Sequence, residues 1–145
     1  KQKPLTLLAL RLDEESEVKQ FWGADILKKA QELLLDLCVR KWGLRGVHQA
    51  EGHLYVMSHQ VTSSVLKEAV ELQSQLQEQG RELLGFRISL SGGIAEASLH
   101  AEQPADLKRL TEEALRHMQA KGGGRVGIPK AIRGGLSGDV PPDVG

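Results

Sequence analysis

The feature that most constrains the fold of this chain is a pair of short strand-like segments joined by a tight turn. Residues 44–49 and 53–58 read as the two strands of a β-hairpin, and Gly52 in the turn between them can adopt positive φ. Apolar residues at helical spacing lie on both sides of this segment. The hairpin therefore has to belong to a sheet against which helices pack.

Strands and helices alternate along the rest of the chain. Apolar runs and period-two alternation predict strands at 5–12, 44–49, 53–58, 83–95 and 125–128. Apolar residues three and four positions apart predict helices over 13–40, 62–80 and 104–121. The resulting order is β-α-β-β-α-β-α-β. Its first strand is almost entirely apolar, which is typical of a strand buried at the centre of a sheet.

Small residues mark several of the predicted boundaries. Thr62 or Ser63 can cap the second helix with a side-chain oxygen, and Gly80 is expected to end that helix. Gly23 is expected to interrupt or kink the first helix. The adjacent glycines at 92–93 permit a bulge or a close approach of another backbone.

These elements predict an α/β domain (an α+β sandwich) with one mixed, mostly antiparallel central sheet flanked by helices. The chain has 145 residues, of which 40% are hydrophobic, which is enough for one domain with its own core. We expect this domain over residues 1–128. Residues 129–145 are rich in glycine and proline without apolar periodicity, which predicts a tail or linker. Since the chain begins with Lys1 and not with methionine, we expect a domain cut from a longer protein.

Composition excludes several classes of function. Nineteen basic residues balance nineteen acidic ones, which argues against broad electrostatic binding to nucleic acid or to an anionic membrane. No apolar run reaches the roughly 18 residues of a membrane span, and no signal-peptide pattern is present, so we expect a cytoplasmic domain. Cys38 is the single cysteine, which excludes an internal disulfide and a cysteine-rich metal site. Its place on an apolar helix face predicts a buried small hydrophobic residue.

Two strings in the C-terminal half resemble the GGDEF domain of diguanylate cyclases, the bacterial signalling enzymes that make cyclic di-GMP. Residues 87–95 look like the family's strand that ends Ser-x-Gly-x-Ala, and residues 113–125 look like its last helix, which ends Ala-Lys-x-x-Gly-Arg. With the order of elements, the resemblance covers about 5–128. It implies the family's fold, a sheet of the palm type found in nucleotidyl cyclases.

The resemblance also locates the residues of the family's reaction, which uses two divalent cations held by carboxylates. One carboxylate closes the family's first strand; Arg11 stands at that position here, and Asp13 matches only the second acid. The other is the third residue of the signature turn. That turn here consists of Ala50, Glu51, Gly52, His53 and Leu54. The third residue is therefore Gly52, and His53 follows where the family has Glu. The resemblance thus implies a degenerate domain that is not an enzyme, with no catalytic residue, no metal and no cofactor.

Other family positions have changed as well. The guanine-reading Asn falls near Lys19. The inhibitory product site, Arg-x-x-Asp in the family, falls at 41–44, where Lys41 keeps the charge and Leu44 loses the acid.

Two positions keep the family's residue types. Lys121 and Arg125 retain the Lys-x-x-Gly-Arg spacing that in the family meets the nucleotide's phosphates, and both side chains are good phosphate partners. The glycines at 122–124 could add backbone N–H groups. The alternative interpretation is structural: Lys121 favours the helix C-terminus through the dipole, Arg125 opens a surface strand, and the glycines form a helix cap and turn.

The remaining polar residues favour structural interpretations. His48, His53 and His59 lie close in sequence, but His53 and His59 have opposite parity on one strand, so we expect structural or surface histidines. No Gly-x-Ser-x-Gly elbow accompanies the serines, which argues against a hydrolase. The acidic pairs at 14–15 and 112–113 are expected to be solvated charges at helix starts.

The leading hypothesis is a catalytically inactive GGDEF-like regulatory domain. It would act by binding a protein partner or a second copy within a larger signalling protein. The alternative is a non-catalytic sensor that binds GTP or a cyclic dinucleotide through Lys121 and Arg125. An active cyclase with rearranged metal ligands is a third possibility. Polymerases share the same palm-like core, but their first-strand carboxylates are missing here too.

Overall fold

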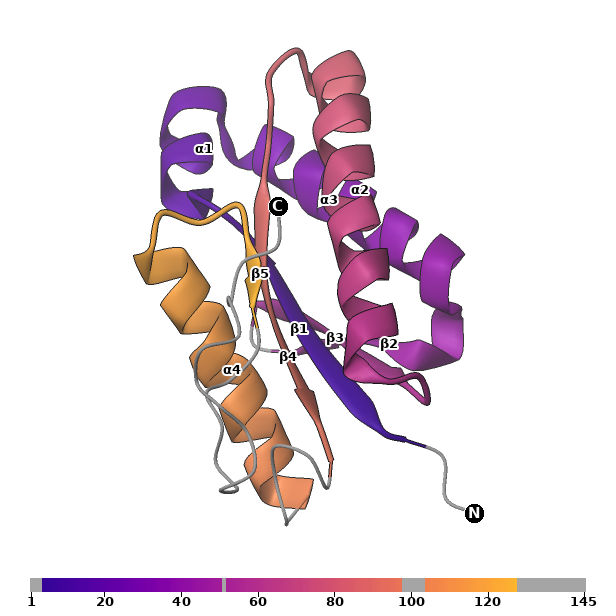
Figure 1. Cartoon of the computed structure of the whole chain (residues 1–145). Helices are drawn as coiled ribbons and strands as arrows, with labels where there is room; N and C mark the ends of the chain where they lie inside the picture. The colour runs from indigo at the N-terminus through magenta and orange to yellow at the C-terminus, as the bar shows by residue number, and fades with distance from the viewer. Residues whose placement is uncertain (1–3, 51, 98–103, 128–145) are drawn as a thin grey trace.

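The computed structural model describes residues 4–50, 52–97 and 104–127. Its strands are β1 (Thr6–Leu12), β2 (Val47–Ala50), β3 (His53–Ser58), β4 (Leu90–Glu96) and β5 (Val126–Gly127). Its helices are α1 (Glu15–Trp22), α2 (Ala24–Trp42), the 3-10 helix η1 (Leu44–Gly46), α3 (Thr62–Leu84) and α4 (Pro104–Ala120). The predicted order is confirmed, with the first helix divided in two and a 3-10 turn before β2 (Figure 1). No helix in the described part of the chain is long and apolar enough to cross a bilayer.

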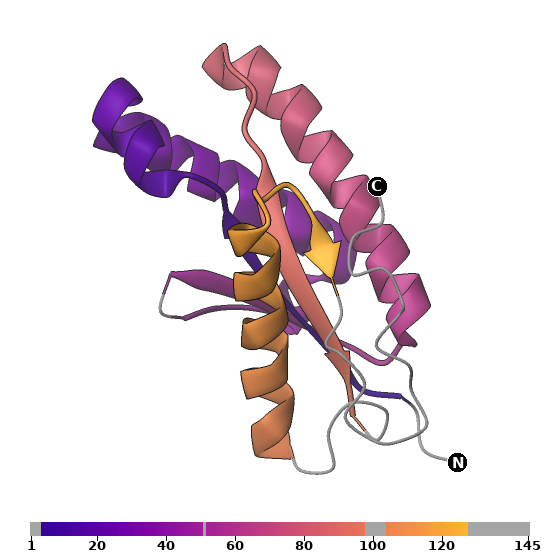
Figure 2. The same ribbon diagram turned by 60° about the vertical axis from the view of Figure 1, so that its left-hand side comes forward.

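The sheet has the strand order β2-β3-β1-β4-β5. The strand β1 lies at its centre, antiparallel to both β3 and β4, and β5 pairs parallel with β4. Helices α2 and α3 cover one face of the sheet and α4 covers the other (Figures 1 and 2). The predicted fold class, a mixed and mostly antiparallel sheet between helices, is confirmed.

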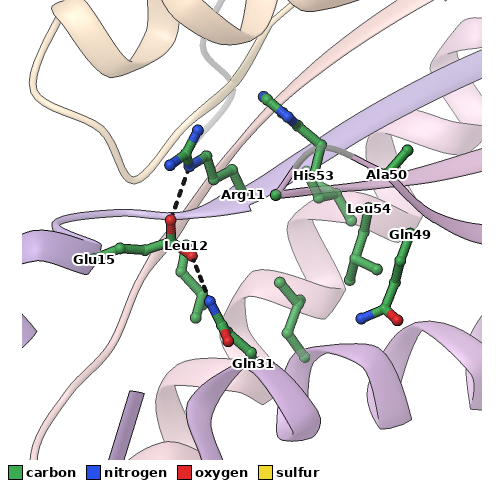
Figure 3. Close-up of a pocket in the computed structure, with 11 residues that line it drawn as sticks. Arg11, Leu12, Glu15, Gln31, Gln49, Ala50, His53 and Leu54 are labelled. Atoms are coloured by element: carbon green, nitrogen blue, oxygen red, sulfur yellow. Dashed lines mark hydrogen bonds and ion pairs between the residues drawn. The ribbon is translucent and has the colours of Figure 1, made fainter. Parts of the chain in front are cut away.

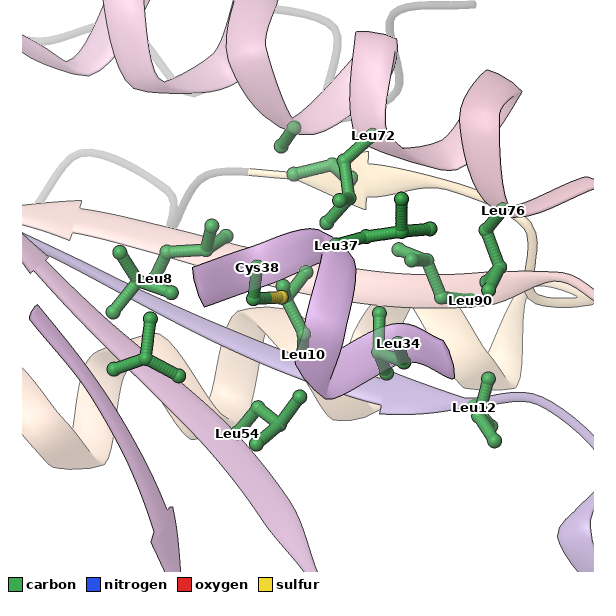
Figure 4. Close-up of a cluster of buried hydrophobic side chains, with 14 of the residues drawn as sticks. Leu8, Leu10, Leu12, Leu34, Leu37, Cys38, Leu54, Leu72, Leu76 and Leu90 are labelled. Atoms are coloured by element: carbon green, nitrogen blue, oxygen red, sulfur yellow. The ribbon is translucent and has the colours of Figure 1, made fainter. Parts of the chain in front are cut away.

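The core divides into two layers because side chains alternate along β1. Leu8, Leu10 and Leu12 point toward α2 and α3 and join the larger cluster (Figure 4). Leu7 and Ala9 point the other way and join the smaller cluster under α4. Both faces of β1 are buried, which explains why its residues form an almost uninterrupted apolar run.

Cys38 lies inside the larger cluster with its side chain fully buried, which confirms the prediction from the helical pattern (Figure 4). Burial raises the pKa of its thiol to about 12. The thiol is therefore protonated and inert at neutral pH.

Two glycines were expected to break or end helices, and one of them does not. Gly23, at φ 99°, separates α1 from α2 as predicted. Gly80 does not end α3, which continues to Leu84 and ends at Gly85 in the left-handed conformation. Gly80 is buried, and a Cβ there would lie 2.8 Å from Cγ1 of Ile88. The glycine allows α3 to approach this segment and does not stop the helix.

The predicted start of β4 was also wrong. The strand begins at Leu90, since Leu83 and Leu84 belong to α3 and residues 86–89 form no strand. Ile88 is buried and Arg87 is exposed, but this alternation reflects packing in the larger core cluster and not sheet pairing.

The expected cap of α3 is replaced by a tertiary contact. Thr62 is the first helical residue, and neither it nor Ser63 caps the helix with its side chain. The carboxylate of Glu96, on β4, accepts hydrogen bonds from the Thr62 backbone N at 2.8 Å and from its Oγ1 at 2.7 Å. A carboxylate 34 residues away thus satisfies the helix N-terminus.

Close backbone packing at the 92–93 glycines is confirmed. A Cβ at Gly93 would lie 2.2 Å from the carbonyl oxygen of Thr111 on α4.

The strand β2 begins at Val47, three residues after the predicted start, because the residues before it form η1. Residues 98–103, Ile128 and the predicted tail at 129–145 lie outside the described residues.

Candidate functional site

A cavity of about 270 Å³ opens beside the C-terminal end of β1. It lies between α2, the start of α1 and the β2–β3 hairpin (Figure 3). Its apolar lining is formed by Leu10, Leu12, Leu34 and Leu54, and its polar lining by Arg11, Glu15, Gln31, Gln49 and His53. The cavity is slightly smaller than the roughly 300–1,000 Å³ of most small-molecule sites, and its lining is more polar than theirs.

Arg11 borders this cavity as part of a polar network at the end of β1. Its Nε donates to Oε1 of Glu15 at 2.9 Å, and Nε2 of Gln31 donates to Oε2 of the same carboxylate at 3.0 Å (Figure 3). The Glu15 side chain is only 16% exposed. The prediction that Glu15 is a solvated helix-start charge was therefore wrong: it neutralises the cation at the strand end. Sequence reasoning missed Gln31 because α2 brings it there from 16 residues away.

Asp13 is held by donors from three parts of the chain. Its Oδ1 accepts from Oγ of Ser91 at 2.6 Å. Its Oδ2 accepts from Oγ of Ser89 and from the backbone N of Gly124, each at 2.7 Å. A Cβ at Gly123 would lie 2.7 Å from the Asp13 carboxyl carbon. The carboxylate therefore ties the end of β1 to β4 and to the α4–β5 loop.

The residues at this strand end do not fit a divalent cation. Mg²⁺ needs several oxygen ligands, whereas Arg11 brings a positive charge to this strand end and pairs with the neighbouring Glu15 carboxylate. Across the described residues, no group of three or more His, Cys, Asp or Glu side chains could hold a metal ion.

The predicted turn is a hairpin turn that borders the same cavity. Ala50 pairs with His53, so the connection is two residues long, and Gly52 adopts φ 81°. Ala50, Gly52, His53 and Leu54 line the cavity together with Arg11. Two positions that the resemblance compares with metal ligands, at the first strand and in the turn, thus lie at one site.

The backbone N–H groups of the α4–β5 loop donate hydrogen bonds to the end of α4 and to Asp13. The backbone N of Gly123 donates to Met118 O at 3.0 Å and that of Gly122 to Gln119 O at 3.1 Å, which is the Schellman pattern of a helix end. The N–H of Gly124 goes to Asp13. The cap interpretation of this glycine run is confirmed. The suggestion that its N–H groups face a phosphate was wrong, because all three are used within the protein.

Lys121 and Arg125 stand on either side of this loop. The Lys121 side chain is exposed, and Arg125 is half-buried with its carbonyl accepting from Gly92 N at 2.9 Å. Arg11 pairs with Ser91 across β1 and β4, and the parallel β4–β5 register places Arg125 beside the same serine. The backbones of the two arginines are therefore about 10 Å apart, two strand spacings, on the face of the sheet that α4 packs against.

The remaining polar candidates lie on the surface or contact neighbouring segments. His48 is exposed on β2, and Nδ1 of His59 lies 3.2 Å from the Pro4 carbonyl oxygen. Glu112 was expected to be a solvated charge, but it accepts a hydrogen bond from the Tyr55 hydroxyl across the α4 face. It also lies 3.8 Å from Nζ of Lys108.

Comparison with known proteins places this geometry in a known fold. No protein-family model and no curated protein sequence matches the chain. Among solved structures, the active GGEEF domain of a diguanylate cyclase from Vibrio cholerae superposes with a TM-score of 0.69 at 16% identity, over 88% of this chain and 84% of that one. The GGDEF domain of DgcB from Caulobacter crescentus, in complex with c-di-GMP, gives 0.72 at 16% identity over 88% and 77%. The FimX GGDEF domain from Pseudomonas aeruginosa gives 0.64 at 17% identity over 85% and 79%. This chain is therefore a GGDEF-like domain in its fold.

Proposed function

We propose that this chain is a catalytically inactive GGDEF-like regulatory domain. It would act by contact with a protein partner or with a second copy inside a larger signalling or regulatory protein. The observation that carries the proposal is the end of β1, where Glu15 fixes the Arg11 cation and three donors occupy Asp13.

Electrostatics supports this proposal. Arg11 places a guanidinium at this strand end, and its ion pair engages Glu15, the neighbouring carboxylate that a divalent cation would need as a ligand. The Asp13 carboxylate has a structural role at this strand end, because it accepts hydrogen bonds that join β1, β4 and the α4–β5 loop.

The direct test is incubation with GTP and either Mg²⁺ or Mn²⁺, with cyclic di-GMP measured by chromatography. An active GGDEF domain run in parallel supplies the positive control. We expect no product above the background without protein. Sustained formation of cyclic di-GMP would show that the chain is an active cyclase.

A second candidate function is a non-catalytic sensor for GTP or a cyclic dinucleotide. Its support is the placement of Arg11 and Arg125 on either side of Ser91, with Lys121 exposed at the start of the same loop. The DgcB neighbour was solved with c-di-GMP. Because guanidinium groups pair well with phosphates, the site could hold a nucleotide without a metal.

Calorimetric titration with GTP and with cyclic di-GMP tests the sensor. If it is correct, Arg125→Ala and Lys121→Ala each weaken binding about tenfold or more, as expected for loss of a charged phosphate contact. Arg40→Ala is the matched control, since Arg40 is an exposed arginine paired with Asp36 on α2. Absence of heat with every nucleotide would eliminate the sensor and leave the first proposal in place.

A further inference from the structure

The helix α1 is only weakly anchored to the hydrophobic core. None of residues 13–29 is buried, and α1 contributes no side chain to either core cluster. The helix packs against α2 at the upper end of the molecule in Figure 1. A helix of eight residues is not stable by itself in water, so α1 depends on a few contacts with its neighbours.

Two contacts hold the two ends of α1. At its first residue, the Glu15 carboxylate accepts hydrogen bonds from Nε of Arg11 at 2.9 Å and from Nε2 of Gln31 at 3.0 Å (Figure 3). At its last residue, the Trp22 ring stacks on Phe86 with centroids 4.5 Å apart. The Arg11 side chain is 39% exposed and Trp22 is 53% exposed. Partly exposed contacts of this kind are weak, so they can break while the core stays folded.

The backbone at both ends of α1 is suited to a hinge. Glu14, directly before the helix, lies in the left-handed region at φ 56° and ψ 39°. It is the only residue other than glycine with positive φ in the described part of the chain. This conformation costs free energy for a glutamate, so opening of α1 would relieve strain. Gly23, at φ 99°, separates α1 from α2 and adopts other backbone conformations readily.

The start of α1 forms part of the wall of the cavity at the end of β1. Glu15 and Gln31, which are hydrogen-bonded to each other, both belong to its lining. Leu34 follows Gln31 by one turn on α2, lines the same cavity and is only 3% exposed. Movement of α1 away from α2 would therefore remove Glu15 from the wall, release Nε of Arg11 and widen the access to Leu34.

We propose that α1 is a gate over this cavity, hinged at Glu14 and Gly23 and held closed by the contacts of Glu15 and Trp22. Closure neutralises Arg11 and restricts the cavity to about 270 Å³. Opening exposes the apolar lining together with the Arg11 guanidinium. The gate goes beyond both proposed functions and rests on neither, because it would control access to the cavity for a protein segment and for a nucleotide alike.

A thiol placed in the cavity lining tests the gate. In Leu34→Cys at pH 8, a thiol reagent such as dithionitrobenzoate reaches the introduced thiol when α1 opens. Cys38 is fully buried in the larger cluster and reacts only when the whole domain unfolds, so it is an internal standard in the same chain. We expect the introduced thiol to react about tenfold or more faster than Cys38, as for a local opening that needs less free energy than global unfolding.

Three further substitutions, each made in Leu34→Cys, separate the gate from general loosening. Glu15→Gln removes the ion pair with Arg11 and should speed the reaction of the introduced thiol about threefold, without changing that of Cys38. Glu17→Gln is the matched control, because Glu17 is exposed on the same helix, and it should change neither rate. Glu14→Asn should slow the reaction about twofold, since asparagine tolerates the left-handed region better than glutamate does.

Equal rates for the two thiols would overturn the proposal, because the lining would then open only with the whole domain. A fast reaction that Glu15→Gln leaves unchanged would overturn it as well, because the cavity would be accessible without movement of α1. If Leu34→Cys weakens the fold, Cys38 also reacts faster, and NMR relaxation dispersion on the unmodified chain decides. One opening rate shared by the α1 amides and the Arg11 Nε–H supports the gate, and the absence of exchange there overturns it. The cyclic di-GMP assay tests the proposed inactivity separately.

Discussion

Arg11 donates from its Nε to Oε1 of Glu15 at 2.9 Å, and this ion pair closes the end of the central strand. Both residues line the cavity between β1, α2 and the hairpin. The pair places a neutralised cation at the position that the sequence resemblance compares with a metal ligand. Four predictions follow from this site and from the packing around it.

Replacing the cation by a carboxylate should make the strand end respond to metal. Arg11→Asp would put a third acid beside Asp13 and Glu15. The like charges should lower the melting temperature by a few degrees, which corresponds to about 1 kcal/mol in a domain of this size. Millimolar Mn²⁺ should then restore part of the loss. Arg11→Gln, which removes the charge without adding an acid, should show no response to Mn²⁺. Scanning calorimetry with and without metal makes the comparison, and equal behaviour of the two variants would contradict the prediction.

Asp13 should matter for stability more than its half-exposed position suggests. Asp13→Asn keeps the shape but removes the negative charge, so the contacts with Ser89, Ser91 and Gly124 are no longer charge-assisted. We expect a loss of about 2–3 kcal/mol in the free energy of unfolding, as for charge-assisted hydrogen bonds to a partly buried acceptor. Asp25→Asn, at an exposed position in the first turn of α2, should cost under about 1 kcal/mol. Urea unfolding measures both, and similar losses would refute the structural role of Asp13.

Two glycines should differ in their tolerance of a methyl group. A Cβ at Gly93 meets the Thr111 carbonyl oxygen at 2.2 Å and the Leu115 backbone N at 2.5 Å, so the α4 backbone would have to move. Gly93→Ala should therefore destabilise the domain by about 3 kcal/mol or more. At Gly80 the obstacle is a side chain, and alanine improves helix propensity by about 1 kcal/mol, so Gly80→Ala should cost less. Denaturant unfolding of the two variants would rank them, and the reverse order would be incompatible with this packing.

The buried thiol should make stability depend on pH in the alkaline range. Burial raises the pKa of Cys38 to about 12 from its ordinary value of 9.0. The unfolded chain therefore loses this proton at lower pH than the folded chain does. The stabilisation is complete below about pH 9 and is lost as the pH rises toward 12.

Cys38→Ala isolates this contribution, because the other alkaline groups titrate in both proteins. The difference in unfolding free energy between wild type and variant should shrink from pH 9 to pH 11. A constant difference would mean that the thiol titrates alike in the folded and unfolded chains. In the folded protein at pH 8, thiol reagents should react with Cys38 only at the rate of unfolding.

Much of the fold could be predicted because burial leaves a local periodic pattern. The run at β1, the helical spacing of α2 and α3, and the two-residue hairpin each depend on neighbours within about ten residues. Gly23 could be predicted to break the first helix because glycine is a poor helix former and readily adopts positive φ, as it does here at φ 99°. The cap at Gly122 and Gly123 followed from helix-end geometry alone.

The site could be predicted only in outline. The resemblance singled out Arg11 and Gly52, and the structure brings both to one cavity. The partner of Arg11 and the role of Gln31 were missed, because an exposed glutamate on a short helix has the same local pattern as one that faces a strand end. The stacking of Trp22 on Phe86 was also missed, since it joins segments 64 residues apart.

The sequence by itself determined the order of the elements and which strand is central. These properties depend on residue type and on spacing over short stretches of the chain. Only the tertiary structure decided that Asp13 is held by Ser89, Ser91 and Gly124, that Glu96 caps α3, and that Gly80 lies inside a helix. Each of these depends on which strands pair and how closely helices approach. Those choices arise from the packing of the whole core, so no local pattern records them.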